Sequence, residues 1–93
     1  MEPLSEQEIR IAVSNLNGWE HGNDKIKKKF EFGDFKEALA FIVRIGLEAE
    51  KLGHHPGLFN VYNTVKIELS THDAGDKVTQ KDIDLATAIE GII

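Results

Sequence analysis

The sequence predicts an α+β fold in which a four-stranded antiparallel sheet has three helices packed on one face. Capping residues stand in front of three stretches whose apolar side chains recur at helical spacing. Between these stretches, other segments alternate apolar and polar residues as strands do, and short turns join them. Such turns favour antiparallel pairing, so the expected order is α-β-β-α-β-β-α. We expect residues 1–93 to form one domain.

The first helix is expected to begin after Ser5, because Ser5 and Glu8 match the capping-box pattern S-x-x-E. It should end near Gly18. An extended stretch follows, residues 22–24 are typical of a turn, and residues 25–32 are typical of a strand. Together these segments predict a hairpin.

One basic cluster, Lys25 with Lys27, Lys28 and Lys29, lies in the second strand of that hairpin. Two interpretations are open. Lysines on an edge strand discourage aggregation between sheets, whereas a phosphate-binding patch would use the same residues. The edge strand is favoured, and the net charge of −5 argues against general nucleic-acid binding.

The second helix is expected to run from a cap at Asp34 to about Leu52, where Gly53 is a natural stop. Apolar side chains cover most of its circumference, whereas charged ones share a narrow stripe: Glu37, Arg44, Glu48 and Lys51. A surface helix of a monomer normally has a broad polar face. We therefore expect this helix to be buried on two sides, against the sheet and against another subunit.

The last third of the chain is expected to hold two strands and a helix. Residues 59–71 alternate as one strand, with four apolar side chains on one face: Val61, Val65, Ile67 and Leu69. A turn at residues 74–76 and a short strand at residues 77–78 follow. Thr79 and Asp82 then cap a closing helix with an apolar seam of Ile83, Ala86, Ile89 and Ile93.

Composition excludes several classes of protein. The chain has no cysteine, hence no disulfide, no thiolate zinc site and no cysteine nucleophile. It has no apolar N-terminal segment of the signal-peptide type and no apolar run of about 18 residues. Nothing therefore indicates export or membrane insertion, and we expect a cytoplasmic protein.

Three of the four histidines, His54, His55 and His72, lie at the ends of successive predicted elements, whereas His21 lies in a turn-like surface segment. Imidazole titrates near neutrality, so converging histidines can give and take protons at physiological pH. By strand parity, His72 would lie on the open face of the sheet.

Glu50 is the carboxylate next to this cluster, about 120° around the helix from the charged stripe. If the helix continues past Gly53, Glu50 and His54 are i,i+4 neighbours, and the carboxylate can orient and partly charge the imidazole. His55 precedes Pro56, which favours extended backbone. His54 and His55 should then point in different directions and have different roles.

Three interpretations of the cluster are open. Two histidines could cap a helix C-terminus while the third completes a strand end. A metal site is less favoured, because adjacent histidines seldom chelate one ion together and no i,i+4 histidine pair is present. The third interpretation is metal-free acid–base catalysis, in which one imidazolium donates a proton and another group accepts one.

These motifs taken together resemble the pterin-4a-carbinolamine dehydratase family. The resemblance rests on Glu50-Lys51-x-x-His54-His55-Pro56, Phe59-Asn60-Val61-Tyr62-Asn63, Thr71-His72 and Asp82-x-x-Leu85-Ala86, and it extends upstream through Gly18-Trp19 and Phe30-x-Phe32-x-Asp34-Phe35. Two departures stand out. Gly57-Leu58 replaces a polar residue and a tryptophan that are common in relatives, and residues 73–78 differ from the usual Gly-Gly-Leu-Thr form.

The resemblance implies a dehydratase that removes water from 4a-hydroxytetrahydrobiopterin and gives quinonoid dihydropterin for tetrahydrobiopterin recycling. His54 and His72 are the acid–base candidates, and Glu50 would polarise His54. His55 and Pro56 would bind the pterin. Asp82 has two open interpretations, as a carboxylate that lines the pocket or as an acid that stabilises the helix dipole. The chemistry needs no cofactor, because the N5 lone pair can expel water once the 4a-oxygen is protonated.

The family also implies other partners and roles. Some relatives are dimerisation cofactors that bind a homeodomain transcription factor through a helix surface and act as transcriptional coactivators, and others support molybdopterin metabolism. A tetramer built as a dimer of dimers is the quaternary structure that the family suggests. The sequence predicts self-association and leaves homodimer and homotetramer open.

Overall fold

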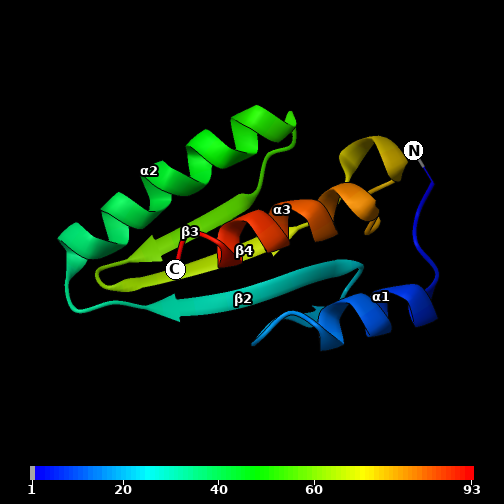
Figure 1. The fold of residues 1–93 in the computed structure, drawn as a ribbon, viewed down its shortest axis with the longest axis horizontal. Helices are drawn as coiled ribbons and strands as arrows, with labels where there is room; N and C mark the ends of the chain where they lie inside the picture. The colour runs from blue at the N-terminus through cyan, green and yellow to red at the C-terminus, as the bar shows by residue number, and fades with distance from the viewer. Residues whose placement is uncertain (1) are drawn as a thin grey trace.

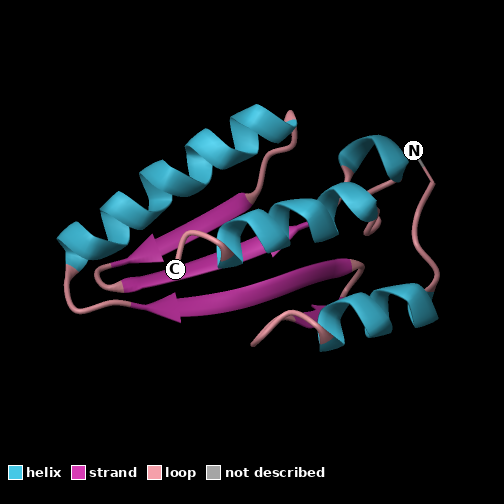
Figure 2. Cartoon of the chain, viewed as in Figure 1, coloured by secondary structure: helices cyan, strands magenta, loops and turns pink. Residues whose placement is uncertain are grey.

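The computed structural model describes residues 2–93, and these confirm the predicted element order (Figures 1 and 2). The elements are α1 (Glu6–Ser14), β1 (Glu20–Gly22), β2 (Lys25–Glu31), α2 (Phe35–Leu52), β3 (Gly57–Val61), β4 (Thr64–Leu69), a 3₁₀ turn η1 (His72–Ala74) and α3 (Gln80–Glu90). Among the described residues, no helix has both the length and the apolar character needed to cross a membrane.

The four strands form one antiparallel sheet in the order β1-β2-β4-β3. The strand with the lysines, β2, is therefore central, and the prediction that it is an edge strand is wrong. On one side it pairs with β4, and on the other the β1 hairpin covers it by pairing Glu20 with Lys27. Three of its lysines form ion pairs, each with an acid of a different element. Lys25 lies 3.1 Å from Glu68 of β4, Lys28 lies 2.9 Å from Glu90 of α3, and Lys29 lies 3.8 Å from Glu31 of β2 itself.

The helices cover one face of this sheet, as Figure 1 shows for α2 and α3. Alternate side chains of β2 and β4 face the helices and are buried: Ile26, Phe30, Val65, Ile67 and Leu69. Against them lie the buried residues of the two longer helices, including Phe41, Ile45, Leu85 and Ile89. On the opposite face, the paired side chains of Phe59 and Lys66 are exposed.

Residues 59–71 form a hairpin, not the single strand that we predicted. Tyr62 adopts a positive φ of 50°, so the chain reverses between β3 and β4, and Val61 pairs with Thr64. Asn60 stabilises the reversal by donating its side-chain N–H groups to the carbonyls of Tyr62 and Thr64. Because Val61 lies opposite Thr64, it faces away from the helices and is exposed, unlike Val65.

The helix ends follow the predicted caps. Ser5 with Glu8 and Thr79 with Asp82 form capping boxes, and the Asp34 side chain accepts a bond from the backbone of Glu37. Gly53 ends α2 in the left-handed conformation, with φ of 64°. The first helix is shorter than expected and ends at Ser14.

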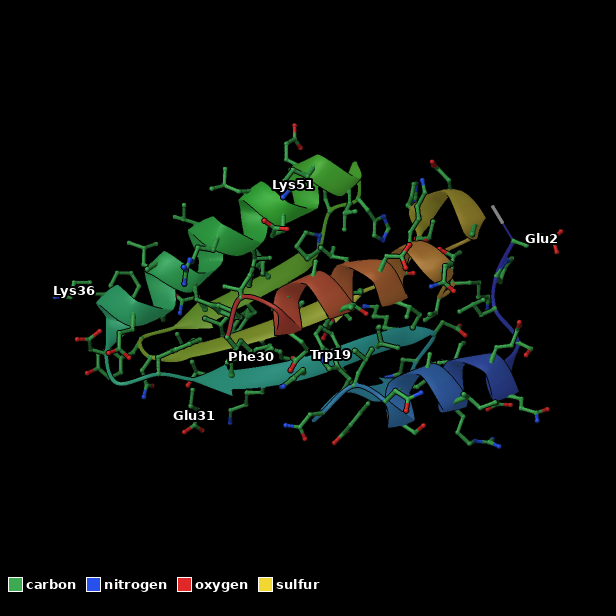
Figure 3. The ribbon with its side chains drawn as sticks, viewed as in Figure 1. Glu2, Trp19, Phe30, Glu31, Lys36 and Lys51 are labelled. Carbon is green, nitrogen blue, oxygen red and sulfur yellow. The ribbon has the colours of Figure 1, made fainter. Side chains whose placement is uncertain are left out.

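Helix α2 is apolar on two sides, as predicted. Ala38, Phe41, Ile45 and Ala49 are buried against the rest of the fold. On its outer side an exposed row, which we call the α2 stripe, consists of Phe35, Leu39, Val43 and Leu47 at intervals of four residues. Figure 3 shows Lys36 and Lys51 at opposite ends of this helix.

A partly buried ion pair connects the C-terminal end of α3 to β2. Glu90 Oε2 accepts hydrogen bonds of 2.9 Å from both Trp19 Nε1 and Lys28 Nζ. Trp19 itself is buried and packs edge-on against Phe30, with ring centroids 6.3 Å apart (Figure 3). Glu90 therefore joins three segments that are distant in sequence.

We expect Glu90→Ala to lower the free energy of unfolding by about 1–3 kcal/mol, because a buried indole N–H and a largely buried ammonium lose their shared acceptor. Urea denaturation followed by tryptophan fluorescence measures this. The matched control is Glu31→Ala, which removes an exposed pair of 3.8 Å with Lys29 and should cost less than about 1 kcal/mol. Equal losses in the two variants would contradict the anchoring role of Glu90.

Candidate active site

The end of α2 turns His54 into the interior. Gly53 reverses the chain, and the His54 backbone N–H donates to the Ala49 carbonyl across the reversal at 3.1 Å. The His54 side chain that follows is only 10% exposed. Its Nε2 lies 2.5 Å from Oδ1 of Asp82, which belongs to the first turn of α3.

Asp82 is fully buried and lies behind His54. Its second oxygen, Oδ2, accepts hydrogen bonds from the Thr79 backbone N–H at 2.9 Å and from the Thr71 hydroxyl at 2.8 Å. The capping role predicted for Asp82 is therefore confirmed. The carboxylate is buried and is not among the residues that line the cleft, and it contacts one of them, His54.

His55 points outward, as expected for the residue before Pro56, and is exposed together with Glu50. Its Nε2 lies 2.7 Å from Glu50 Oε1. The predicted contact between Glu50 and His54 is wrong. The helix ends at Leu52, and the left-handed Gly53 turns His54 inward, so that His55 rather than His54 meets the carboxylate.

His72 begins the 3₁₀ turn that follows β4, and its side chain is 91% exposed. It lies beyond the last residue of the strand, so strand parity does not place it on the open face of the sheet as predicted. Its Nδ1 lies 3.0 Å from Asp76 Oδ1. The hydrogen bond and charge of Asp76, with the charge of Asp73 in addition, raise the pKa of His72 above its ordinary value.

We expect the His72 imidazole of an Asp76→Asn variant to titrate at lower pH than that of the wild type. The substitution removes the negative charge that favours the imidazolium, so the raised pKa should fall towards its ordinary value. Proton NMR of the imidazole resonances against pH measures the change. His21, on β1 and outside this turn, is the internal control. An unchanged His72 midpoint would show that Asp76 does not set it.

These segments meet around a cleft of about 230 Å³. Its lining comes from the end of α2, the end of β4 and the start of α3: Gly53, His54, His55, Ser70, Thr71, His72, Asp73 and Lys81. The cleft brings together the three histidines that the sequence singled out, whereas Glu50, Pro56 and Asp82 are not part of its lining. Across residues 2–93, no three His, Cys, Asp or Glu side chains are grouped so that they could hold a metal ion.

Sequence reasoning missed four residues of the site: Thr71, Thr79, Asp76 and Lys81. The pattern Thr79-x-x-Asp82 was used only as a helix cap, although the same carboxylate also bonds a histidine. Thr71 immediately precedes His72, and a hydroxyl next to a candidate catalytic residue was a signal that could have been followed. Asp76 is four residues after His72, a spacing that a turn brings into contact.

A small α+β fold with two differently partnered histidines on one cleft defines a class of proteins suited to acid–base chemistry on a small molecule. The sequence model of the Pterin 4 alpha carbinolamine dehydratase family matches residues 2–92. Relatives provisionally named pterin-4-alpha-carbinolamine dehydratase include one from Opitutus terrae, 46% identical over 96% of this chain and 92% of its own, and one from Christiangramia forsetii, 47% identical over 100% and 95%. The chain belongs to this family.

Solved structures agree with the fold. A crystal structure from Brucella melitensis, described as a transcriptional coactivator/pterin dehydratase, is similar with a TM-score of 0.92 and 39% identity over 98% of both chains. A pterin dehydratase-like protein identified as a RuBisCO assembly factor in the alpha-carboxysome gives a TM-score of 0.68 at 20% identity, over 82% of this chain and 89% of its own. At that identity the second likeness concerns the fold alone.

Proposed function

We propose that this protein is a dehydratase that removes water from 4a-hydroxytetrahydropterin, the pterin-4a-carbinolamine. The observation that carries the proposal is the buried His54, whose Nε2 is engaged by Asp82, on one cleft with His72, whose Nδ1 is engaged by Asp76. Each imidazole thus has one nitrogen held by a carboxylate and one left for a ligand. Family membership and the names of the relatives support the same substrate class.

In the proposed reaction the C4a–O bond breaks and a C4a=N5 double bond forms. His72 donates a proton from Nε2 to the 4a-hydroxyl, which leaves as water, because its raised pKa favours the imidazolium. His54 accepts the N5 proton on Nδ1. The two proton transfers balance the equation, and the organic product is a quinonoid dihydropterin. Positioned acid–base groups contribute roughly 10²–10⁴-fold to such a rate.

His55, Pro56 and Glu50 are proposed to act at the rim of the cleft. Because Glu50 contacts His55 at 2.7 Å, we assign it to orienting His55 against the pterin and not to polarising His54. The pair is exposed, with side-chain exposures of 68% and 77%, so a ligand can reach it. Tetrahydrobiopterin recycling in the cytoplasm is the proposed setting, in which a reductase must consume the quinonoid product.

The test is stopped-flow absorbance of quinonoid dihydropterin formation from freshly generated carbinolamine. The wild type should accelerate dehydration strongly, and His54→Ala should abolish the acceleration. His21→Ala, which removes an exposed histidine outside the cleft, is the matched control and should behave as the wild type. A well-folded wild type that does not exceed the spontaneous rate would overturn the proposal.

Self-association is the second proposal, and the α2 stripe is the surface that supports it. In an antiparallel pair of α2 helices centred on Val43, Leu39 is level with Leu47 of a second copy. The same arrangement sets Lys36 level with Glu50 of that copy, so opposite charges meet at both ends of the paired helices, where Phe35 is level with Lys51. We propose that a second copy of this chain covers the stripe in a homodimer or homotetramer.

A non-enzymatic role is the alternative occupant of that surface. The structure from Brucella melitensis is described as a coactivator as well as a pterin dehydratase. If this chain served only as a dimerisation cofactor for a transcription factor, a His54→Ala/His72→Ala double variant would keep its function in the cell. Under the dehydratase proposal that folded double variant is inactive.

A further inference from the structure

A chain of hydrogen bonds with a fixed direction lies behind His54. The Lys81 backbone N–H donates to Thr79 Oγ1 at 3.2 Å, and Thr79 Oγ1 lies 2.7 Å from Thr71 Oγ1. The Thr71 hydroxyl has one proton, which goes to Oδ2 of Asp82 at 2.8 Å because an ionised carboxylate can only accept. The Thr79 hydroxyl must therefore donate to Thr71.

This arrangement satisfies Oδ2 of Asp82 completely. Oδ2 receives the Thr71 hydroxyl and the Thr79 backbone N–H, which leaves Oδ1 for His54. Thr71 is 4% exposed, and Thr79 and Asp82 are fully buried, so water does not compete for these groups. No buried side-chain polar atom among the described residues lacks a partner. Because these groups are shielded from water, each hydrogen-bond donor has a large effect on the stability of the negative charge of the carboxylate.

The state of the carboxylate decides which nitrogen of His54 holds the proton. An ionised Asp82 with two donors on Oδ2 offers Oδ1 as an acceptor, so His54 Nε2 must hold a proton and donate it. Within residues 2–93, the side-chain hydrogen bonds of His54 involve Nε2 alone. In neutral His54, Nδ1 then has its lone pair free, and His54 is one of the residues that line the cleft.

We propose that Thr71 is a positioning residue. By donating to Oδ2, its hydroxyl stabilises the ionised form of Asp82, whose Oδ1 can only accept a hydrogen bond, and it thereby keeps His54 in the Nε2–H tautomer. Its place in catalysis rests on the proposed dehydratase function, whereas its effect on the tautomer does not. Thr71 touches no reacting atom in this role. It acts through Asp82 and His54, and it makes Nδ1 the nitrogen that exchanges a proton with the substrate.

Thr71→Val tests this, because valine keeps the shape of threonine and removes the hydroxyl. Long-range ¹H–¹⁵N NMR of the His54 ring reports the tautomer without any substrate. The wild type should show the Nε2–H tautomer, and Thr71→Val should show a smaller fraction of it. Loss of one such hydrogen bond should lower kcat about tenfold. KM should stay within about twofold, because Thr71 binds no substrate through its hydroxyl.

Two further variants separate positioning from packing. Thr71→Ser retains the hydroxyl and should restore both the tautomer and kcat. Thr87→Val makes the same substitution on the exposed side of α3, where the hydroxyl bonds only the Ile83 carbonyl, and should match the wild type. Failure of Thr71→Ser to restore the tautomer would show that only the packing of Thr71 matters.

The wild type alone also tests the proposal, whether or not Thr71→Val folds. A His54 ring protonated at Nδ1 in the neutral protein would overturn it, as would a folded Thr71→Val with the wild-type tautomer and kcat. A wild type that shows the Nε2–H tautomer but no dehydration would refute the proposed function and leave the effect of Thr71 on His54 standing.

Discussion

Asp82→Asn is expected to lower the catalysed rate of carbinolamine dehydration by roughly 10²–10⁴-fold while the fold persists. The asparagine oxygen can still accept the bonds from Thr71 and Thr79, so the cap of α3 survives. Its NH₂ group then faces His54, which must accept with Nε2 and hold its proton on Nδ1. The nitrogen assigned to the N5 proton is thereby blocked.

Stopped-flow kinetics measure the rate, and far-UV circular dichroism with urea denaturation checks the fold. The matched control is Asp84→Asn, two residues away on α3, where the carboxylate is exposed and bonds only Gln80. It should retain the wild-type rate. A folded Asp82→Asn protein with wild-type kinetics would remove Asp82, and the tautomer argument with it, from the mechanism.

Val43→Glu is expected to dissociate the oligomer, raising its dissociation constant at least about 10²-fold. In the proposed antiparallel pair Val43 lies on the two-fold axis, so the variant brings two carboxylates together in an apolar contact. The isolated chain should still fold, because Val43 is 55% exposed and outside the core. Sedimentation velocity over a concentration series measures the state of association.

Ile11→Glu is the control for that experiment. Ile11 is similarly exposed, at 57%, but lies on α1, so the same charge enters away from the α2 stripe. This variant should associate as the wild type does. A wild type that is monomeric at micromolar concentration would contradict self-association and leave the stripe available to a different protein.

The element order was predictable because its signals are local. Ser5, Asp34, Thr79 and Gly53 each act within one helical turn, on backbone groups that no tertiary contact needs to supply. The hairpin at Tyr62 was missed for a related reason. Val61 and Val65 are four residues apart, so the alternation of apolar and polar residues continues unbroken through the turn. The two valines nevertheless lie on opposite faces of the sheet.

The site was predictable in its residue types and not in its contacts. The cluster of His54, His55 and His72 was visible in the sequence, and the cleft does bring the three together. Spacing suggested that Glu50 holds His54. The left-handed Gly53 redirects the chain, and the carboxylate bonds His55 instead. The partner of His54 is Asp82, 28 residues along the chain, and no spacing rule relates such positions.

The sequence by itself therefore determined the class of fold, the helix caps, the two-sided apolar character of α2 and the histidines available for proton transfer. Only the tertiary structure decided which carboxylate serves which histidine. Packing α3 against the end of α2 buries Asp82 with Thr71 and Thr79, whereas Asp76 meets His72 in an exposed turn. Burial and hydrogen-bond partners set the behaviour of an imidazole, and both arise when segments distant in sequence come into contact.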